Sequence, residues 1–158
     1  GRKSLRRKIR KIFLIGHSQG GYMVTRLNTM HATNGVIANA PGPLNLVYRC
    51  GLEENGQAPP SAVCNLLRQN YGTTTANPGA YTARSLLNFT SGHRSDILFV
   101  QGMQDSPIQL ASWPTFRTQI NECSNCQNRQ FLDVAGAGHT ALFDNAEAIA
   151  VYNTFINR

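Results

Sequence analysis

The sequence has no long apolar run, no internal repeat and no segment of low complexity. The missing apolar run excludes a membrane-spanning helix, which needs about 20 consecutive apolar residues. Charged residues make up only 15% of the 158 residues and hydrophobic residues 41%, a balance that excludes a disordered chain. The length predicts a single domain over residues 1–158. The basic N-terminus is not followed by the apolar stretch and cleavage site of a signal peptide.

Lysine is absent after residue 11, and the net charge of +7 comes from the N-terminus. Seven of the fifteen Lys and Arg residues precede residue 12, and the other eight balance the eight Asp and Glu residues. We interpret residues 1–11 as a solvated basic lead-in. A basic arm can bind nucleic acid or a membrane surface. No aromatic side chain is interleaved with these charges to stack on bases, so we expect no nucleic-acid partner.

Cysteine is scarce, at four residues, and its spacing leaves its role open. Cys50 and Cys64 flank a loop that contains Pro and Gly, while Cys123 and Cys126 form a CxxC, so two local disulfides are one interpretation. A four-cysteine zinc site and free buried thiols are the alternatives. The lack of lysine after residue 11 and the presence of a glycosylation sequon at Asn88 favour a secreted or periplasmic protein. We expect neither a metal nor another cofactor.

Strand-like and helix-like segments alternate along the chain. Alternation of this kind predicts an α/β fold with about four parallel strands flanked by helices. Residues 41–94, rich in Pro, Gly and Asn, form an excursion or cap-like region with two short helices. The expected strands cover residues 11–16, 35–40, 96–102 and 129–134, and the expected helices cover residues 20–31, 61–69, 78–88 and 112–121, with a last helix from residue 144.

The most informative motif is the G-x-S-x-G at residues 16–20. It follows an apolar run and precedes a helix-like segment, which is the context of a nucleophile elbow. Gly16 and Gly20 are expected where the strand and helix backbones pass too close for side chains. Ser18 is predicted at the apex, with a strained backbone and an exposed hydroxyl. The backbone N–H of Gln19 is expected to point to where an oxyanion would form.

A serine hydroxyl needs a base to take its proton and an acid to orient that base. His139, in a glycine-flanked loop after the fourth expected strand, is the candidate base. Asp105, just after the third expected strand, is the candidate acid. Both residues and Ser18 lie beyond the carboxyl ends of parallel strands, where open α/β sheets place their sites. The chain order Ser, Asp, His is the order of α/β-hydrolases.

On these motifs the chain resembles the α/β-hydrolase superfamily over nearly all of its length. The stretch Gly16–Tyr22, the turn Gln101–Asp105 and the loop Gly136–His139 are most similar to the prolyl oligopeptidase family and related esterases. The full fold has about eight strands, and the elbow follows the fifth. The resemblance therefore implies that this chain is the C-terminal half of an α/β-hydrolase fold, with the first half of the sheet missing.

The same resemblance assigns a role to each candidate. Ser18 would be the nucleophile, Asp105 the orienting acid and His139 the general acid and base. The Gln19 N–H would be one oxyanion donor, and the second would come from a loop in the missing half. Losing one such donor slows catalysis about 10²–10³-fold. We expect a fragment or one chain of a two-part enzyme, with little turnover alone and with its elbow strand left as an edge.

Several other titratable residues are expected to be structural. Asp96 begins a strand and Asp133 lies within one, so neither fits the position of the acid. His17 should point away from the nucleophile, and His31 and His93 are expected at the surface.

These observations predict a serine hydrolase that cleaves an ester or peptide bond in a small-molecule or peptide substrate. The triad is the same for both bonds, so the reaction class is better defined than the substrate. The alternative is a catalytically inactive binding protein or remnant that keeps the hydrolase fold.

Overall fold

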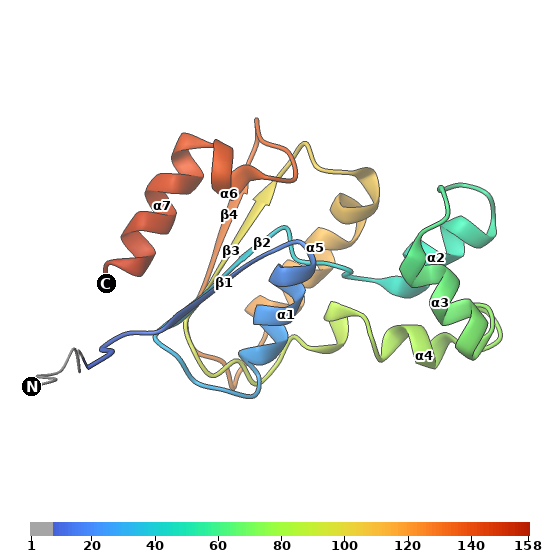
Figure 1. Cartoon of the computed structure of the whole chain (residues 1–158), viewed down its shortest axis with the longest axis horizontal. Coiled ribbons are helices and arrows are strands. Elements are labelled where there is room, and N and C mark those ends of the chain that lie inside the picture. The colour runs from blue at the N-terminus through green and yellow to red at the C-terminus, as the bar shows by residue number, and fades with distance from the viewer. Residues whose placement is uncertain (1–7) are drawn as a thin grey trace, which may run out of the picture.

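A computed structural model describes residues 8–158, and residues 1–7 of the predicted basic lead-in lie outside this range. Four parallel strands form one sheet in the order β1-β2-β3-β4, with helices on both sides (Figure 1). The predicted α/β sheet is confirmed, and each strand limit agrees with the prediction to within two residues. The strands are β1 (Phe13–His17), β2 (Gly35–Asn39), β3 (Ile97–Gly102) and β4 (Arg129–Val134).

Two helical layers cover the sheet. Side chains of the central strands alternate between these layers, as the pleat of a strand requires. Every residue of β2 and β3 is buried, which explains their continuous apolar runs. One face packs against α1 (Gln19–Leu27) and α5 (Pro107–Asn121), and the other packs against α6 (Ala141–Asp144) and α7 (Ala146–Ile156).

Residues 41–94 leave the sheet between β2 and β3 and form a helical insertion. Its α-helices stand together beside the sheet, apart from α7 (Figure 1). They enclose a small core of their own, made of Leu46, Cys50, Cys64, Leu67 and Tyr81. The insertion contains α2 (Leu46–Glu54), α3 (Ala62–Tyr71), α4 (Pro78–Thr82) and the 3₁₀ helix η1 (Leu86–Asn88).

The prediction of two helices in the insertion is wrong, because it misses α2 and merges α4 with η1. Asn45 starts α2, since its side-chain oxygen accepts a hydrogen bond from the Tyr48 N–H at 3.1 Å. The predicted helix over residues 78–88 ends at Thr82 and resumes at Leu86.

Other helix limits also differ from the prediction. Ser106 caps α5, so this helix begins at Pro107 rather than at residue 112. Proline suits the first helical position, because that N–H has no acceptor within the helix. Pro114, expected near the helix start, lies inside α5. α1 ends at Leu27 rather than residue 31, and α7 begins at Ala146.

β1 is an edge strand of the described sheet. Within residues 8–158 it pairs with β2 alone, and its Ile15 side chain is exposed. No helix in this part of the chain is long and apolar enough to cross a membrane.

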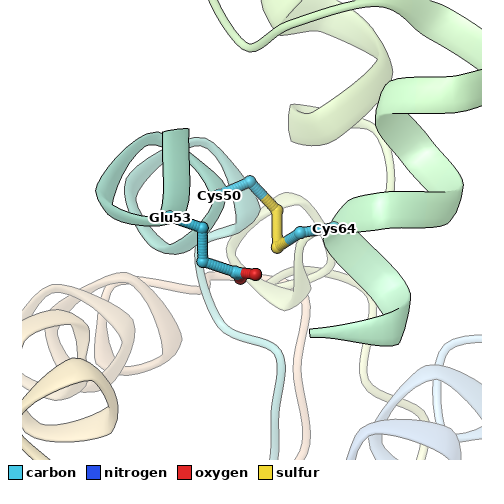
Figure 2. A group of neighbouring side chains, drawn as sticks. All are labelled: Cys50, Glu53 and Cys64. Atoms are coloured by element: carbon cyan, nitrogen blue, oxygen red, sulfur yellow. A yellow bond between two sulfur atoms is a disulfide. The ribbon is translucent and has the colours of Figure 1, made fainter. Parts of the chain in front are cut away.

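The four cysteines form two disulfides. Cys50–Cys64 joins α2 to α3, and Cys123–Cys126 closes a short turn before β4. Figure 2 shows the first bond with the Glu53 side chain beside it. Both sulfur atoms and a Glu53 carboxylate oxygen lie within 4.8 Å of one another, but bonded sulfurs are not the thiolates that zinc needs. The local disulfides are confirmed, and the zinc and free-thiol interpretations are wrong.

Candidate active site

Ser18 forms the sharp turn between β1 and α1. Its φ of 58° and ψ of −114° are rare for a residue with a side chain, so the backbone is strained as predicted. Backbone hydrogen bonds hold the turn. The Ser18 N–H donates to the Asn39 carbonyl at 2.8 Å, and the Ser18 carbonyl accepts from the Tyr22 N–H at 3.0 Å.

The glycines of this turn differ in the space around them. A Cβ on Gly16 would lie 2.0 Å from the Gly20 carbonyl oxygen, so the predicted close approach is confirmed there. The prediction is wrong for Gly20, where a Cβ would meet no atom within 4 Å beyond its chain neighbours and the backbone of its own helix. Gly21 is the second tight position, since its Cβ would lie 3.1 Å from the Asn39 carbonyl oxygen.

The structure brings Ser18, His139 and Asp105 together beyond the carboxyl ends of β1, β4 and β3. His139 Nε2 lies 3.0 Å from Ser18 Oγ, and His139 Nδ1 lies 2.8 Å from Asp105 Oδ2. An ionised carboxylate can only accept a hydrogen bond, so Nδ1 carries the proton. Nε2 is then free to accept from the serine hydroxyl.

Asp105 is held in its ionised form. Burial acts to raise the pKa of this carboxyl, whose side chain is 5% exposed. Hydrogen bonds outweigh burial and lower the pKa of Asp105 below its ordinary value. The donors are His139, the Gln101 side-chain amide at 2.9 Å and the Ser106 N–H at 2.6 Å.

A cavity of about 800 Å³ opens beside these residues. Ser18, His139 and Gln19 line one side of it, and its size suits a small-molecule ligand. Gln19 is the first residue of α1, so its N–H has no acceptor within the helix.

The helical insertion also lines this cavity. Residues 61–63, at the start of α3, and Arg49, on α2, line it. Sequence reasoning missed Arg49, because α2 was not predicted and no motif marks the residue.

Asn39 is a second residue that sequence reasoning missed. Its buried side chain donates to His17 Nδ1 at 2.7 Å and to the His139 carbonyl at 3.0 Å. Its oxygen accepts from the Leu142 N–H at 3.1 Å, so one side chain ties the end of β2 to the His139 loop. Asn39 ends a buried apolar run, which is the only signal that the sequence offers.

His17 lies nearer the site than predicted. Its ring centroid lies 4.8 Å from that of His139 and the residue lines the cavity, so the expectation that it points away is wrong. Burial and the nearby His139 lower the pKa of His17, against the opposing effect of Asp105.

The other carboxylates near the strand ends have partners of their own. Asp133 accepts from the Trp113 indole N–H at 3.0 Å and pairs with Arg117. Asp96 pairs with Arg158 at 2.9 Å. Neither contacts His139.

His93 is 1% exposed, so its predicted surface position is wrong, whereas His31 is exposed as predicted. The His93 Nε2–H donates to the Phe89 carbonyl at 3.0 Å, and Nδ1 accepts from the Asn28 side-chain amide at 3.2 Å. Because one ring nitrogen donates and the other accepts, the buried His93 ring is neutral.

No protein-family model and no curated protein sequence matches the chain. Several solved structures match its fold. Pyrococcus horikoshii acylaminoacyl peptidase, 12% identical, gives a TM-score of 0.67 over 94% of this chain and 24% of that chain. A Pyrococcus furiosus esterase, 17% identical, gives a TM-score of 0.61 over 94% of this chain and 54% of that chain. Porphyromonas gingivalis dipeptidyl peptidase 4, 19% identical, gives a TM-score of 0.61 over 92% of this chain and 19% of that chain.

These structures are α/β-hydrolases, and the chain shares their fold. It spans about a quarter of the first peptidase and about half of the esterase. The predicted fold class, four parallel strands flanked by helices as part of an α/β-hydrolase fold, is confirmed. A likeness at this level of identity concerns the fold alone.

Proposed function

We propose that the chain is a serine hydrolase that cleaves an ester or peptide bond in a small-molecule or peptide substrate. The observation that carries the proposal is the pair of contacts made by His139, at 3.0 Å to Ser18 Oγ and 2.8 Å to Asp105 Oδ2. The strained elbow and the cavity beside it add support. The peptidases and the esterase that share the fold are consistent with this class.

In the proposed reaction, Ser18 Oγ attacks the substrate carbonyl carbon while its proton passes to His139 Nε2. The bond to the leaving group breaks, and the leaving group takes that proton. Water then attacks the acyl carbon, giving a proton to Nε2. The ester bond to Ser18 breaks, and Oγ recovers the proton. The Asp105 carboxylate stabilises the imidazolium at both stages, because it lies against Nδ1–H.

The carbonyl oxygen gains negative charge at each attack and needs hydrogen-bond donors. We assign the Gln19 N–H as one donor. The second is proposed to come from a segment beside β1, equivalent to the part of the matched hydrolases that this chain does not cover. That segment, the N-terminal half of the fold, is the proposed protein partner.

Paired substrates test the reaction and its bond type. We expect the folded chain to hydrolyse p-nitrophenyl butyrate, an activated ester, only slowly while the second oxyanion donor is missing, and Ser18→Ala to abolish that slow rate. Exposed Ser124→Ala is the control and should leave the rate unchanged. An aminoacyl p-nitroanilide measured beside the ester distinguishes a peptidase from an esterase. A rate that Ser18→Ala leaves unchanged contradicts the proposal.

A further inference from the structure

One positive charge faces the cavity beside Ser18. Arg49 is the only Lys or Arg among the lining residues of the described chain. Its side chain is 38% exposed, so ligands can reach it. The acidic lining residue, Asp105, is almost fully covered and accepts hydrogen bonds from its neighbours. The accessible charge of the cavity wall is therefore cationic.

The guanidinium of Arg49 is only weakly engaged by protein. Its Nε lies 3.8 Å from Glu53 Oε2, which is beyond hydrogen-bonding distance. Both Glu53 oxygens already accept from Ser61, Oε1 from the N–H and Oε2 from the hydroxyl at 2.8 Å. Within residues 8–158 no acceptor lies at hydrogen-bonding distance from the Arg49 side chain.

The backbone that carries Arg49 is firmly held. The next residue, Cys50, is bonded to Cys64 of α3, and Glu53 reaches from α2 to the start of α3 beside that bond (Figure 2). The Glu53 side chain is 2% exposed, and its negative charge attracts the guanidinium to this wall. A cation on a fixed helix loses less conformational entropy when it binds a ligand.

We propose that Arg49 is a specificity-determining residue that binds a carboxylate group of the substrate. This inference rests on the proposed hydrolase function. A guanidinium presents two parallel N–H groups that match the two oxygens of a carboxylate. A dianionic phosphate fits less well, because one cation would face two negative charges with the Glu53 carboxylate 3.8 Å away. Preferred substrates are therefore esters or amides that also bear one free carboxylate.

Matched esters test this preference. The p-nitrophenyl monoesters of glutaric, adipic and pimelic acid each carry a free carboxylate at a different distance from the ester carbonyl. Each is compared with a neutral ester in which an isopropyl group replaces the carboxylate. We expect one acid monoester to be favoured, and Arg49→Gln to lower its kcat/KM by about 10- to 100-fold. The neutral partner should change less than about threefold, and Arg49→Lys should restore part of the preference.

Arg68→Gln is the matched control. Arg68 lies on α3, pairs with Glu54 at 3.7 Å and does not line the cavity, so its loss disturbs the insertion without removing the proposed contact. The inference is overturned if Arg49→Gln lowers kcat/KM equally for the acid and the neutral esters, or if the unmodified chain prefers neutral esters. It is also overturned if Arg68→Gln removes the preference for the acid ester.

A binding measurement separates this inference from the hydrolase proposal. The mono-p-nitroanilides of glutaric, adipic and pimelic acid are each titrated into the Ser18→Ala protein by calorimetry, which requires no turnover. Binding that Arg49→Gln weakens about 10-fold or more, and Arg68→Gln does not, supports the carboxylate site even if no ester is cleaved. Absent binding, or binding that Arg49→Gln leaves unchanged, overturns the inference.

Discussion

At the scale of single residues, the turn at Ser18 has room for a side chain at Gly20 and none at Gly16. A Cβ at position 16 would overlap the Gly20 carbonyl oxygen at 2.0 Å, so Gly16→Ala must move backbone. We expect it to lower the free energy of unfolding by about 2 kcal/mol or more. Gly20→Ala lies in the first turn of α1 with open space around it, and should raise stability by up to about 1 kcal/mol. Urea unfolding of the two variants measures both values, and equal losses would contradict the account.

Asn39 is expected to position the His139 loop. Asn39→Ala removes three hydrogen bonds and leaves the buried Leu142 N–H without its acceptor, whereas the half-buried His17 lines the cavity. We expect a loss of about 2–3 kcal/mol in the free energy of unfolding. The kcat for p-nitrophenyl butyrate should fall more than KM changes, because His139 loses its fixed place. Exposed Asn65→Ala is the control, and equal effects of the two variants would show that Asn39 has no special role.

The candidate site residues divide into those with a sequence signal and those without one. Ser18, Asp105 and His139 each follow a strand in hydrolase order, so they were predictable as a set. Their mutual distances depend on how four strands align, which no local pattern encodes. Asn39 contacts the His139 loop far along the chain, and Arg49 lines a cavity whose other lining residues come from distant segments, so only the fold reveals them.

At the scale of elements, the Cys50–Cys64 disulfide fixes the wall of the cavity. It joins α2 to α3, and both helices contribute lining residues. We expect the Cys50→Ala, Cys64→Ala double variant to raise KM several-fold and to lower the free energy of unfolding by about 3 kcal/mol. The Cys123→Ala, Cys126→Ala double variant should leave KM unchanged, because that disulfide closes a turn away from the cavity. Steady-state kinetics of both double variants measures KM. Equal KM values in the two would contradict the proposed role of the Cys50–Cys64 disulfide in fixing the cavity wall.

The strands were easier to predict than the helices. Each buried strand is a short apolar run, so burial on both faces is visible in the sequence. Helix starts depend on which of several polar residues caps the helix. Ser106 and Asn45 act as caps, whereas Pro114 looked like a first-turn proline and is not. α2 follows a Pro- and Gly-rich segment, and its packing against α3 and α4 stabilises it more than local propensity does.

At the scale of the whole molecule, His93 should make stability depend on pH. Burial is the main cause of its lowered pKa in the folded chain, below the ordinary value of 6.5. Below pH 6.5 the unfolded chain therefore binds a proton that the folded chain does not, so the free energy of unfolding falls as pH falls. His17 acts in the same direction. Denaturant unfolding at pH 7.5 and 5.5 should show the loss, and His93→Gln should reduce it.

Exposed His31 supplies the control for this pH effect. His31→Gln should leave the difference in the free energy of unfolding between pH 7.5 and pH 5.5 the same as in the unmodified chain. A difference that His93→Gln preserves, or that His31→Gln removes, would place the effect elsewhere in the molecule.

The central claim is that His139 and Asp105 activate Ser18, and covalent labelling tests it most directly. A fluorophosphonate probe reacts with an activated serine and requires no complete catalytic cycle. We predict labelling at Ser18, located by mass spectrometry, with Ser18→Ala unlabelled and His139→Ala labelled at least 100-fold more slowly. A folded chain that stays unlabelled even with its proposed N-terminal partner, or that labels equally without His139, would contradict the account and favour a binding protein that keeps the fold.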